Sequence, residues 1–480
     1  MKLSELKKLF IKNHLYMEDE GDAEFTHISC DSRNVRPGTL FFAKGAMFKP
    51  EYLFSALEKG AAGYICDKDY GAAAPHIMVS NIRLAMPLAA KHFYGDPTAK
   101  FPLVGVTGTK GKTTCAYMLK NIFTLAYGAE KTAIISTNEA LSGTKKIEKS
   151  FTTPEALELY QIFDTFARDG VSAAVMEVSS QGLQYNRVEY ADFDIGIFLN
   201  LSPDHVSPTE HKDFAEYKAA KKRLFGMCRY GIINIDDEHA PEMMEGSRCE
   251  KIYTVAIDRD ADFRATDVLL SKKGVSFRLG GEEFTLNIPG EFNVYNALCA
   301  IAAAKLLGVS SADIRKGLAQ THVQGRMEIL EKDGKTVIVD YAHNALSFNA
   351  VFDYVEAFYP ESRKICVFGC QGNKALGRRV DLPEIAAKKA DFLVLTSDDP
   401  AGEEPEKILE EMEKNLPAAD VEYTKIVDRE QAVKYAVSQA KAGDVIFLAG
   451  KGHEHTQQVK GKAVYYKGDM DCAKEALELE

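Results

Sequence analysis

The segment VGVTGTKGKTT, residues 104–114, constrains the fold of this chain more than any other part of the sequence. It follows a short apolar run and precedes TTCAYMLKNIFTLAYG, a stretch with helical periodicity. A glycine-rich turn between a strand and a helix exposes backbone N–H groups and a helix N-terminus, and both bind phosphate. In such a loop Lys112 neutralises the terminal phosphates and the Thr113 hydroxyl reaches Mg²⁺. The pattern therefore predicts an α/β unit that binds a nucleoside triphosphate.

The loop departs from the general phosphate-loop pattern at one position. That pattern has glycine six residues before the lysine, whereas Val106 stands there in this chain and Gly105 comes one residue earlier. The alternative is a surface loop that merely contains glycines, and the strand before it and helix after it argue against that interpretation.

Strand and helix patterns alternate along the chain and divide it into three parts. From residue 103, the runs LVGVT, AIIST, AAVMEVSS, IGIFLNLS and IINID are typical of a parallel sheet with helices on both faces. Beyond residue 326, KICVFGC, DFLVLTSDDP and DVIFLAGKGHE predict a second doubly wound, Rossmann-like unit. The linker YGDPTAKFP separates a small N-terminal α/β unit. We therefore expect an α/β protein with domains at residues 1–99, 100–326 and 327–480.

Composition excludes several classes of protein. A chain of 480 residues with 46% hydrophobic and 27% charged residues is ordinary for a folded enzyme and unlike a disordered or fibrous protein. A net charge of −11 disfavours binding to nucleic acid or anionic membranes. The nine cysteines have no paired metal-ligand spacing, which is typical of the reducing cytoplasm, and we expect Cys366 and Cys370 to be small buried side chains. Charges throughout the first residues indicate neither a signal peptide nor a membrane anchor.

Further short motifs accompany the phosphate loop in a fixed order. They are DSR at 31–33, TTPE at 152–155, MEVSSQGL at 176–183, NLSPDH at 200–205, YKAAK at 217–221, GEFNVYN at 290–296, GRME at 325–328, DYAHN at 340–344 and GKGHE at 450–454. With the GxTGTxGKTT form of the loop, they make the chain resemble the Mur ligase family, in particular the members that add the third amino acid to the peptidoglycan precursor. The resemblance implies a three-domain Mur ligase architecture with a central P-loop sheet and a C-terminal Rossmann-like domain.

The resemblance also implies a reaction. ATP, with Mg²⁺, would convert the D-glutamate γ-carboxylate of UDP-MurNAc-L-Ala-D-Glu into an acyl phosphate that an amine then attacks. The catalytic residues implied are Lys112, Lys221, Glu177 and His205, and the metal ligands are Thr113, Glu177, His205 and Lys221 as its N6-carboxylysine carbamate.

The residues alone leave other interpretations of these side chains open. Glu177 ends an apolar strand, where a buried structural acid also occurs. His205 follows a strand and would more often be solvated or capping a turn. The helical segment AEYKAAKKRLF is amphipathic, so Lys221 would ordinarily face water, as we expect of Lys218 and Lys222.

By the same resemblance, ATP is bound from both sides of the boundary near residue 326. The matching residues are Gly108, Thr109, Lys110, Gly111, Lys112, Thr113, Thr114, Asn293, Asn296, Arg326, Asp340 and His343. Lys110 stands where many members carry asparagine, and Ala345 where many carry proline. A site between domains would close on its substrates and exclude water from the acyl phosphate.

The nucleotide-sugar substrate is expected to contact residues that match the family in the first two domains. They are Ser32, Thr152, Thr153, Ser179 and Arg187. Ser32 by itself would be an ordinary turn residue.

The incoming amino acid is expected in the C-terminal domain, at TSDDPA and GKGHE. The implied contacts are Arg379, Asp398, Asp399, Pro400, Ala401, Gly450 and Glu454. Members that add meso-diaminopimelate carry DNPR, whose arginine pairs with the distal carboxylate, whereas this chain has Ala401. The surrounding acids, including Glu403, Glu404 and Glu406, favour a side-chain ammonium, so we expect L-lysine. The alternatives are meso-diaminopimelate or another diamino acid, and a merely solvated acidic loop.

Two other functions compete with this hypothesis. Folylpolyglutamate synthase shares the loop and the acyl-phosphate chemistry but lacks an N-terminal uridine-binding domain. A P-loop switch protein would have little use for a second ligand-binding α/β domain. We therefore expect a ligase that is cytoplasmic and monomeric. We expect it to bind neither nucleic acid nor a membrane.

Overall fold

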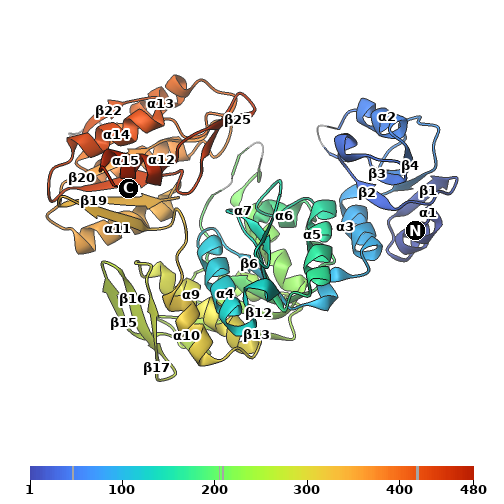
Figure 1. Ribbon diagram of the computed structural model, residues 1–480, viewed down its shortest axis with the longest axis horizontal. Helices are drawn as coiled ribbons and strands as arrows, with labels where there is room; N and C mark the ends of the chain where they lie inside the picture. Colours follow the sequence, from blue (N-terminus) through green and yellow to red (C-terminus); the bar gives the residue numbers. More distant parts are fainter. Residues whose placement is uncertain (46–47, 205, 208–209, 418–420, 480) are drawn as a thin grey trace.

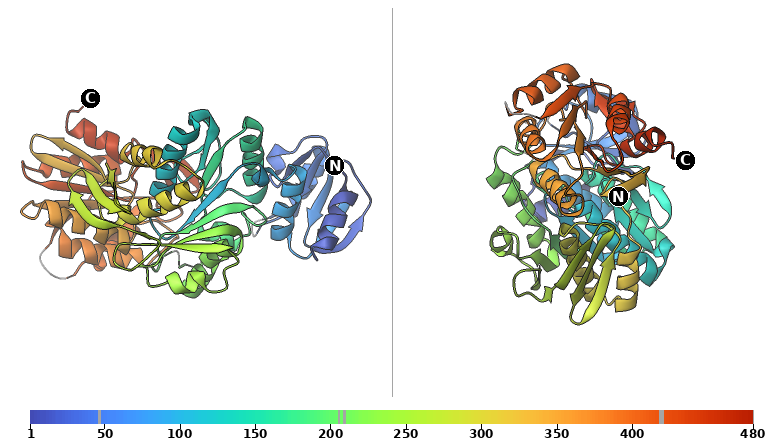
Figure 2. Two further views of the ribbon diagram at one scale, coloured as in Figure 1. Left: turned by 90° about the horizontal axis from the view of Figure 1, so that it is seen from below. Right: turned by 90° about the vertical axis from the view of Figure 1, so that its left-hand side faces the viewer.

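A computed structural model describes residues 1–480 except 46–47, 205, 208–209, 418–420 and 480. The chain forms three α/β units that follow one another along the long axis of the molecule (Figures 1 and 2). The N-terminal unit, in blue, lies at one end and the C-terminal unit, in orange and red, at the other. Within the described residues, no helix is long and apolar enough to cross a membrane.

The N-terminal unit is a five-stranded sheet in the order β1-β5-β4-β3-β2. Its strands are parallel except for the edge strand β1, which pairs with β5 in the antiparallel sense. The elements are α1 (Leu3–Lys12), β1 (Tyr16–Glu20), β2 (His27–Ser29), β3 (Thr39–Phe42), α2 (Pro50–Glu58), β4 (Ala61–Cys66), β5 (His76–Val79) and α3 (Ile82–Phe93). The short 3₁₀ helices η1 (Ser32–Asn34) and η2 (Pro97–Lys100) lie in the DSR segment and in the predicted linker.

The middle unit has a nine-stranded sheet in the order β14-β13-β12-β11-β6-β10-β7-β8-β9. Its strands and helices are β6 (Leu103–Thr107), α4 (Lys112–Tyr127), β7 (Thr132–Ile135), β8 (Ala140–Ser142), β9 (Lys145–Ile147), α5 (Ala156–Asp169), β10 (Ala173–Glu177), α6 (Ser180–Gln184), β11 (Phe193–Phe198), α7 (Phe214–Lys222), β12 (Cys228–Asn234), α8 (Ala240–Met244), β13 (Lys251–Ala256) and β14 (Phe263–Arg264). The short 3₁₀ helices η3 (Ala129–Lys131) and η4 (Arg223–Gly226) follow α4 and α7. The central strands are buried on both faces, which explains their continuous apolar runs. Only the edge departs from the predicted parallel sheet, because β8 and β9 form an antiparallel hairpin there.

A small antiparallel sheet, which the sequence patterns did not predict, follows the central one. It contains β15 (Thr266–Ser271), β16 (Gly274–Leu279) and β17 (Glu282–Leu286) and leads into α9 (Phe292–Leu306) and α10 (Ser311–Ala319). Alternating side chains such as Val275, Phe277 and Leu286 are buried, so this sheet covers the helices of the middle unit with one face.

The C-terminal unit is a six-stranded sheet in the order β18-β19-β23-β20-β21-β22, parallel except for β18. Its elements are β18 (Glu328–Lys332), β19 (Lys335–Asp340), α11 (Ala345–Phe358), β20 (Lys364–Phe368), α12 (Arg378–Lys389), β21 (Phe392–Leu395), α13 (Pro405–Lys414), β22 (Glu422–Lys425), α14 (Arg429–Gln439), β23 (Val445–Ala449), β24 (Thr456–Val459), β25 (Lys462–Tyr465) and α15 (Asp469–Ala476). The predicted α/β fold with two doubly wound units is confirmed. Cys366 and Cys370 are buried, as expected.

Candidate active site

The phosphate loop connects β6 to α4 and is shaped by two glycines. Gly108 and Gly111 have φ values of +157° and +85°. A Cβ on Gly111 would lie 2.2 Å from Oδ1 of Asn296, so only glycine allows α9 to approach the loop this closely. The backbone of Lys110 is fixed by Asn200, whose Oδ1 accepts from Lys110 N at 2.9 Å and whose Nδ2 donates to Lys110 O at 3.1 Å.

Lys112 folds back over this loop. Its Nζ donates to the carbonyls of Gly108 at 2.9 Å and Thr109 at 3.1 Å. Desolvation lowers the pKa of Lys112, which Glu177 and Asp204 partly oppose. Two backbone carbonyls are weak partners for a cation, so an anionic phosphate would compete well for it.

Glu177 ends β10 beside the loop, at the carboxyl edge of the sheet where the sequence placed it. Its Oε1 accepts from Thr113 Oγ1 at 2.9 Å and from Thr137 N at 2.7 Å, and its Oε2 accepts from Thr137 Oγ1 at 3.2 Å. A hydroxyl and a carboxylate beside a phosphate loop are the oxygen ligands that Mg²⁺ takes together with substrate phosphates. Among the described residues, no group of three His, Cys, Asp or Glu side chains forms a metal site. The Thr113 hydroxyl and the Glu177 carboxylate suit a metal ion that also binds phosphate oxygens.

Lys221 on α7 is buried, so the water-facing interpretation of this side chain is wrong. Its Nζ donates to the carbonyl of Gly108 at 2.8 Å and lies 4.5 Å from the centre of the Tyr217 ring. Desolvation lowers the pKa of Lys221 well below its ordinary value, and Lys112 lowers it further. Lys218 and Lys222 instead form surface ion pairs with Glu242 and Glu245, as expected. His205 lies outside the described residues.

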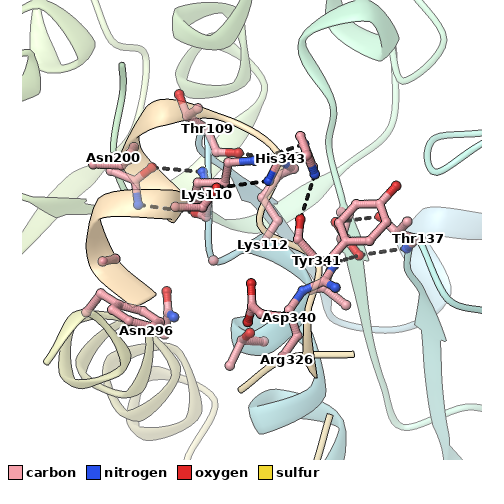
Figure 3. Close-up of a pocket in the computed structure, with 18 of the residues that line it drawn as sticks. Thr109, Lys110, Lys112, Thr137, Asn200, Asn296, Arg326, Asp340, Tyr341 and His343 are labelled. Carbon is pink, nitrogen blue, oxygen red and sulfur yellow. Dashed lines mark hydrogen bonds between the residues drawn. The ribbon is translucent and has the colours of Figure 1, made fainter. Parts of the chain in front are cut away.

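The predicted ATP residues from the two sides of the boundary face each other across one cavity of about 590 Å³ (Figure 3). Lys110 Nζ lies 2.9 Å from Nε2 of His343, whose Nδ1 lies 2.6 Å from the Tyr341 carbonyl. That carbonyl requires a proton on Nδ1, so Nε2 accepts from the lysine. The predicted residues that line this cavity are Thr109, Lys110, Gly111, Lys112, Thr113, Thr114, Asn293, Asn296, Arg326, Asp340 and His343, with Thr152, Glu177 and Ser179.

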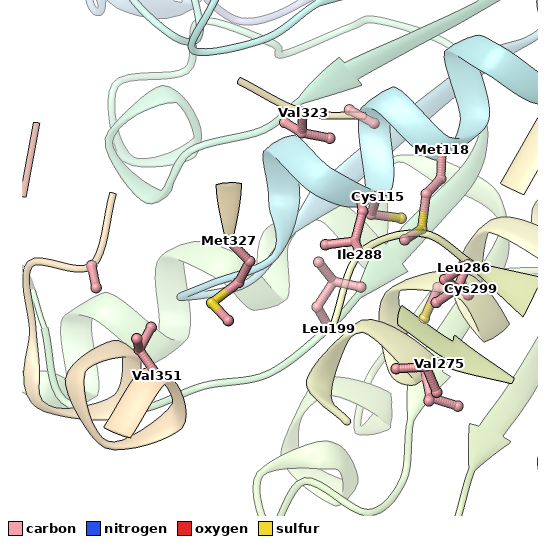
Figure 4. Close-up of a cluster of buried hydrophobic side chains, with 14 of the residues drawn as sticks. Cys115, Met118, Leu199, Val275, Leu286, Ile288, Cys299, Val323, Met327 and Val351 are labelled. Carbon is pink, nitrogen blue, oxygen red and sulfur yellow. The ribbon is translucent and has the colours of Figure 1, made fainter. Parts of the chain in front are cut away.

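A buried apolar cluster packs against α4, the helix that follows the loop (Figure 4). Cys115 and Met118 on α4 belong to one buried cluster with Cys299 on α9 and Leu286 on β17. This packing holds α4, which begins at the end of the loop, against α9.

A buried ion pair between the middle and C-terminal units was not predicted. Asp204 accepts from Arg378 Nη2 at 2.7 Å and from Asn344 Nδ2 at 2.6 Å. Asp204 and Arg378 side chains are only 3% and 9% exposed. Asp204 and Asn344 lie in the NLSPDH and DYAHN motifs, next to the predicted residues His205 and His343. Arg378 directly precedes the predicted residue Arg379.

The residues expected to bind the nucleotide sugar are split between two places. Thr152 and Ser179 line the cavity, whereas Thr153 is buried and bonds to Glu177 O at 2.9 Å and Ser179 N at 3.0 Å. Arg187 pairs with Glu155 at 2.8 Å, and Glu155 also contacts Lys44 of the N-terminal unit. Ser32 lies in η1 of the N-terminal unit and does not line the cavity.

The expected amino-acid residues gather at the carboxyl edge of the C-terminal sheet. Asp398 is buried, which raises the pKa of its carboxyl group above the ordinary value, so the interpretation as a solvated loop is wrong for this residue. Gly450 has φ +110°, and a Cβ there would lie 2.6 Å from Asp398 Oδ2. Lys451, which was not predicted, also lies here, with its Nζ 2.8 Å from Asp399 Oδ1 and in contact with Glu454. Ala401 N donates to Gln458 O at 2.7 Å, and Pro400 packs against Gly372.

Arg379 is already engaged within the protein. Its guanidinium pairs with Glu403 at 2.7 Å and Glu411 at 2.6 Å and donates to the carbonyl of Gln371. The exposed Lys374, which was not predicted, lines the cavity instead.

Two family patterns match the chain. The pattern described as Mur ligase middle domain matches residues 106–304, and the one described as Mur ligase, glutamate ligase domain matches residues 325–452. The chain belongs to the Mur ligase family. The cavity and the expected amino-acid residues lie within, or directly beside, the two matched parts of this Mur ligase, whereas Ser32 lies in the N-terminal unit outside them.

Relatives with different amino-acid substrates are equally similar to this Mur ligase. UDP-N-acetylmuramoyl-L-alanyl-D-glutamate--L-lysine ligase of Streptococcus mutans is 38% identical over 476 residues, 97% of this chain and 95% of that one. UDP-N-acetylmuramoyl-L-alanyl-D-glutamate--2,6-diaminopimelate ligase of Caldanaerobacter subterraneus subsp. tengcongensis is 38% identical over 468 residues, 95% of each chain. Overall identity therefore does not separate the two amino acids.

Solved structures share the fold of this Mur ligase. A UDP-N-acetylmuramoyl-L-alanyl-D-glutamate--2,6-diaminopimelate ligase superposes with a TM-score of 0.65 at 28% identity and covers 95% of both chains. Folylpolyglutamate synthase of Mycobacterium tuberculosis reaches a TM-score of 0.65 at 17% identity but covers 83% of this chain.

Proposed function

We propose that this Mur ligase joins L-lysine to the D-glutamate γ-carboxylate of UDP-MurNAc-L-Ala-D-Glu, with ATP converted to ADP and phosphate. One observation supports this above all: phosphate-loop residues, Glu177 and residues of the C-terminal unit face a single cavity between two units. Such a cavity brings a nucleotide, a carboxylate and an amine within reach of one another.

The chemistry explains why the site collects cations. A carboxylate is a poor electrophile, so its oxygen takes the γ-phosphoryl group of ATP and ADP leaves. The amine of the amino acid then attacks the acyl carbon, and the amide forms as phosphate and a proton depart. Lys112 and Arg326 are proposed to hold the phosphoryl oxygens through both steps, while Lys110, Asn293, Asn296, Asp340 and His343 hold the nucleotide. Mg²⁺, when bound at Thr113 and Glu177, would neutralise phosphate charge.

Lys221 is proposed to act as a carbamate. Its neutral amine would add to CO₂ and lose a proton, which replaces a cation with an anion beside the loop. Its burial and lowered pKa support this proposal, because only the unprotonated amine reacts with CO₂. The carbamate, with His205, would offer oxygen and nitrogen ligands for a second metal.

We assign the substrates to the three domains of residues 1–99, 100–326 and 327–480. Ser32 would contact the nucleotide end, and Thr152, Thr153, Ser179 and Arg187 the sugar and peptide. The amino-acid site would be formed by Asp398, Asp399, Pro400, Gly450 and Glu454. Arg379 would hold the nearby acids Glu403 and Glu411 in place. We also propose that the enzyme is cytoplasmic and that it acts as a monomer.

The amino acid is proposed to be L-lysine because Ala401 offers no partner for the distal carboxylate of meso-diaminopimelate. Burying a neutral polar group without a partner costs roughly 1–3 kcal/mol. Burying the distal carboxylate beside Asp399 and Glu454 would cost more, because it is charged. A discrimination of at least about 100-fold in kcat/KM is expected.

A panel of amino acids tests this proposal. Purified protein with ATP, Mg²⁺ and UDP-MurNAc-L-Ala-D-Glu should release ADP with L-lysine at least about 100-fold faster than with meso-diaminopimelate. The variant Asp399→Asn/Ala401→Arg should gain diaminopimelate use. Equal rates with the two amino acids would refute the specificity, and no ADP release with any amino acid would refute the ligase.

A further inference from the structure

Two cysteines meet at the edge of the middle sheet opposite the phosphate loop. The sulfur atoms of Cys228, which begins β12, and Cys249, which precedes β13, lie 3.4 Å apart. These parallel strands pair Tyr230 with Lys251, and the same register places Cys228 beside Cys249 two residues earlier on each strand. None of the nine cysteines is in a disulfide.

Glycines on the neighbouring strands make room for both sulfur atoms. A Cβ on Gly196 of β11 would lie 2.6 Å from the Cys228 sulfur, so a larger residue there would displace it. A Cβ on Gly231 of β12 would lie 3.3 Å from the Cys249 sulfur. Gly196 and Gly231 are themselves paired across the strands, so the space for the two thiols is continuous.

Cys249 also differs from the other cysteines in the direction of its pKa shift. Burial raises the pKa of Cys30 to about 11 and that of Cys66, Cys370 and Cys472 to about 12. The pKa of Cys249 is lowered instead, mainly because a hydrogen bond from the neighbouring Cys228 thiol would stabilise its thiolate, although burial opposes this effect. Cys249 is partly exposed, whereas Cys228 is buried. An accessible thiolate with a second thiol behind it is the arrangement that thiol–disulfide exchange requires.

We propose that Cys228 and Cys249 are a redox-active pair that small-molecule disulfides oxidise to an intramolecular disulfide. The Cys249 thiolate attacks one sulfur of oxidised glutathione, and one glutathione thiolate leaves. The Cys228 sulfur then attacks the Cys249 sulfur of the mixed disulfide, and the second glutathione leaves. The two protein thiols are oxidised, the glutathione disulfide is reduced, and the two thiol protons end on the two glutathione molecules.

This bond would constrain a loop that reaches the active site. The segment between Cys228 and Cys249 contains α8, whose Glu242 and its neighbour Glu245 pair with Lys218 and Lys222 on either side of Lys221. The disulfide would therefore restrict the movement of α8 against α7. The proposal does not depend on which amino acid the enzyme uses.

Peptide mapping of the full-length protein tests the proposal. After treatment with oxidised glutathione under native conditions, free thiols should fall from nine to seven, and a digest should contain one linked peptide pair with Cys228 and Cys249. Dithiothreitol should restore all thiols. Cys228→Ser should instead retain glutathione on Cys249, and Cys249→Ser should keep its remaining eight thiols.

Cys30→Ser is the matched control, because Cys30 is the other partly exposed cysteine. This variant should still form the Cys228–Cys249 bond. Nine free thiols in the treated wild type, a stable glutathione adduct on wild-type Cys249, or a different pairing would overturn the proposal.

Discussion

At the scale of single residues, Lys112 offers the simplest separation of function from stability. Among the described residues, its ammonium group donates to two backbone carbonyls, so Lys112→Ala removes no core packing. We expect ligation to fall by at least about 10²-fold while the melting temperature stays near that of the wild type. ADP release with both substrates present measures the loss.

Lys120→Ala is the control for Lys112, because Lys120 lies on the same helix and pairs with Glu139 away from the loop. Its activity should stay near wild type. A folded Lys112→Ala protein with normal turnover would remove the phosphate loop from the mechanism.

Lys221 tests whether an anion is needed at a buried lysine. Lys221→Ala should be inactive, and a short-chain carboxylic acid should restore part of its activity because the missing group is a carboxylate. Lys222→Ala, which removes only a surface ion pair, should stay active without added acid. Full activity of Lys221→Ala without added acid, or no rescue by any small carboxylate, would contradict the carbamate.

Lys110 predicts a pH dependence of stability. Desolvation and the cations Arg378, Lys112 and Arg326 lower its pKa from 10.5 to about 7 in the folded chain, although Asp204 opposes them. Between pH 7 and 10 the unfolded chain keeps a proton that the folded chain has released, so this residue makes stability rise with pH. Below pH 7 both states are protonated and its destabilising effect is complete.

Urea denaturation from pH 6 to 9 tests whether Lys110 makes stability rise with pH. As the pH rises, the urea midpoint of Lys110→Met should increase less than that of the wild type. Relative to the wild type, the variant should therefore be most stable at pH 6. Parallel midpoints across this range would show that Lys110 does not titrate there.

At the scale of elements, Gly325 determines how the chain passes between the middle and C-terminal units. It has φ +68°, and a Cβ would lie 2.3 Å from His453 N in the GKGHE loop. Gly325→Ala should therefore lower the urea midpoint and raise the KM for the amino acid, because that loop must move. Steady-state kinetics with varied amino acid measures the second effect.

Gly443→Ala is the control for Gly325→Ala, because it changes a glycine with a similar positive φ where a Cβ would meet no other atom. Gly443 has φ +97° with nothing within 4 Å of a Cβ, so its substitution costs only the left-handed conformation, about 1–2 kcal/mol. We expect a normal KM in this variant. If both variants behaved alike, close packing at Gly325 would have no role.

At the scale of the whole molecule, the Asp204–Arg378 pair joins the middle and C-terminal units. Asp204→Ala leaves the Arg378 guanidinium buried without this carboxylate, a change that typically costs about 3–5 kcal/mol. The C-terminal unit should then separate from the middle one. Small-angle scattering should show a larger radius of gyration, and ligation should be lost.

Asp353→Ala removes a surface pair with Lys389 on the same C-terminal unit and should change neither measurement. An unchanged radius of gyration and full activity in Asp204→Ala would show that other contacts hold the units together.

The sequence by itself determined the elements of this protein and the position of its phosphate loop. Apolar runs, glycines and helical periodicity are local signals, so β6, β10 and β11 and the loop at residues 108–111 could be predicted from them. Glu177 could be placed at a strand end for the same reason.

Only the tertiary structure decided which side chains meet. Helical periodicity placed Lys221 on a solvent face, but α7 packs against the loop and buries it under Gly108 O. The Asp204–Arg378 pair joins residues 174 positions apart, and the Cys228–Cys249 contact depends on strand register. Such contacts arise from the packing of segments that are distant in sequence, and no local pattern in one chain encodes them.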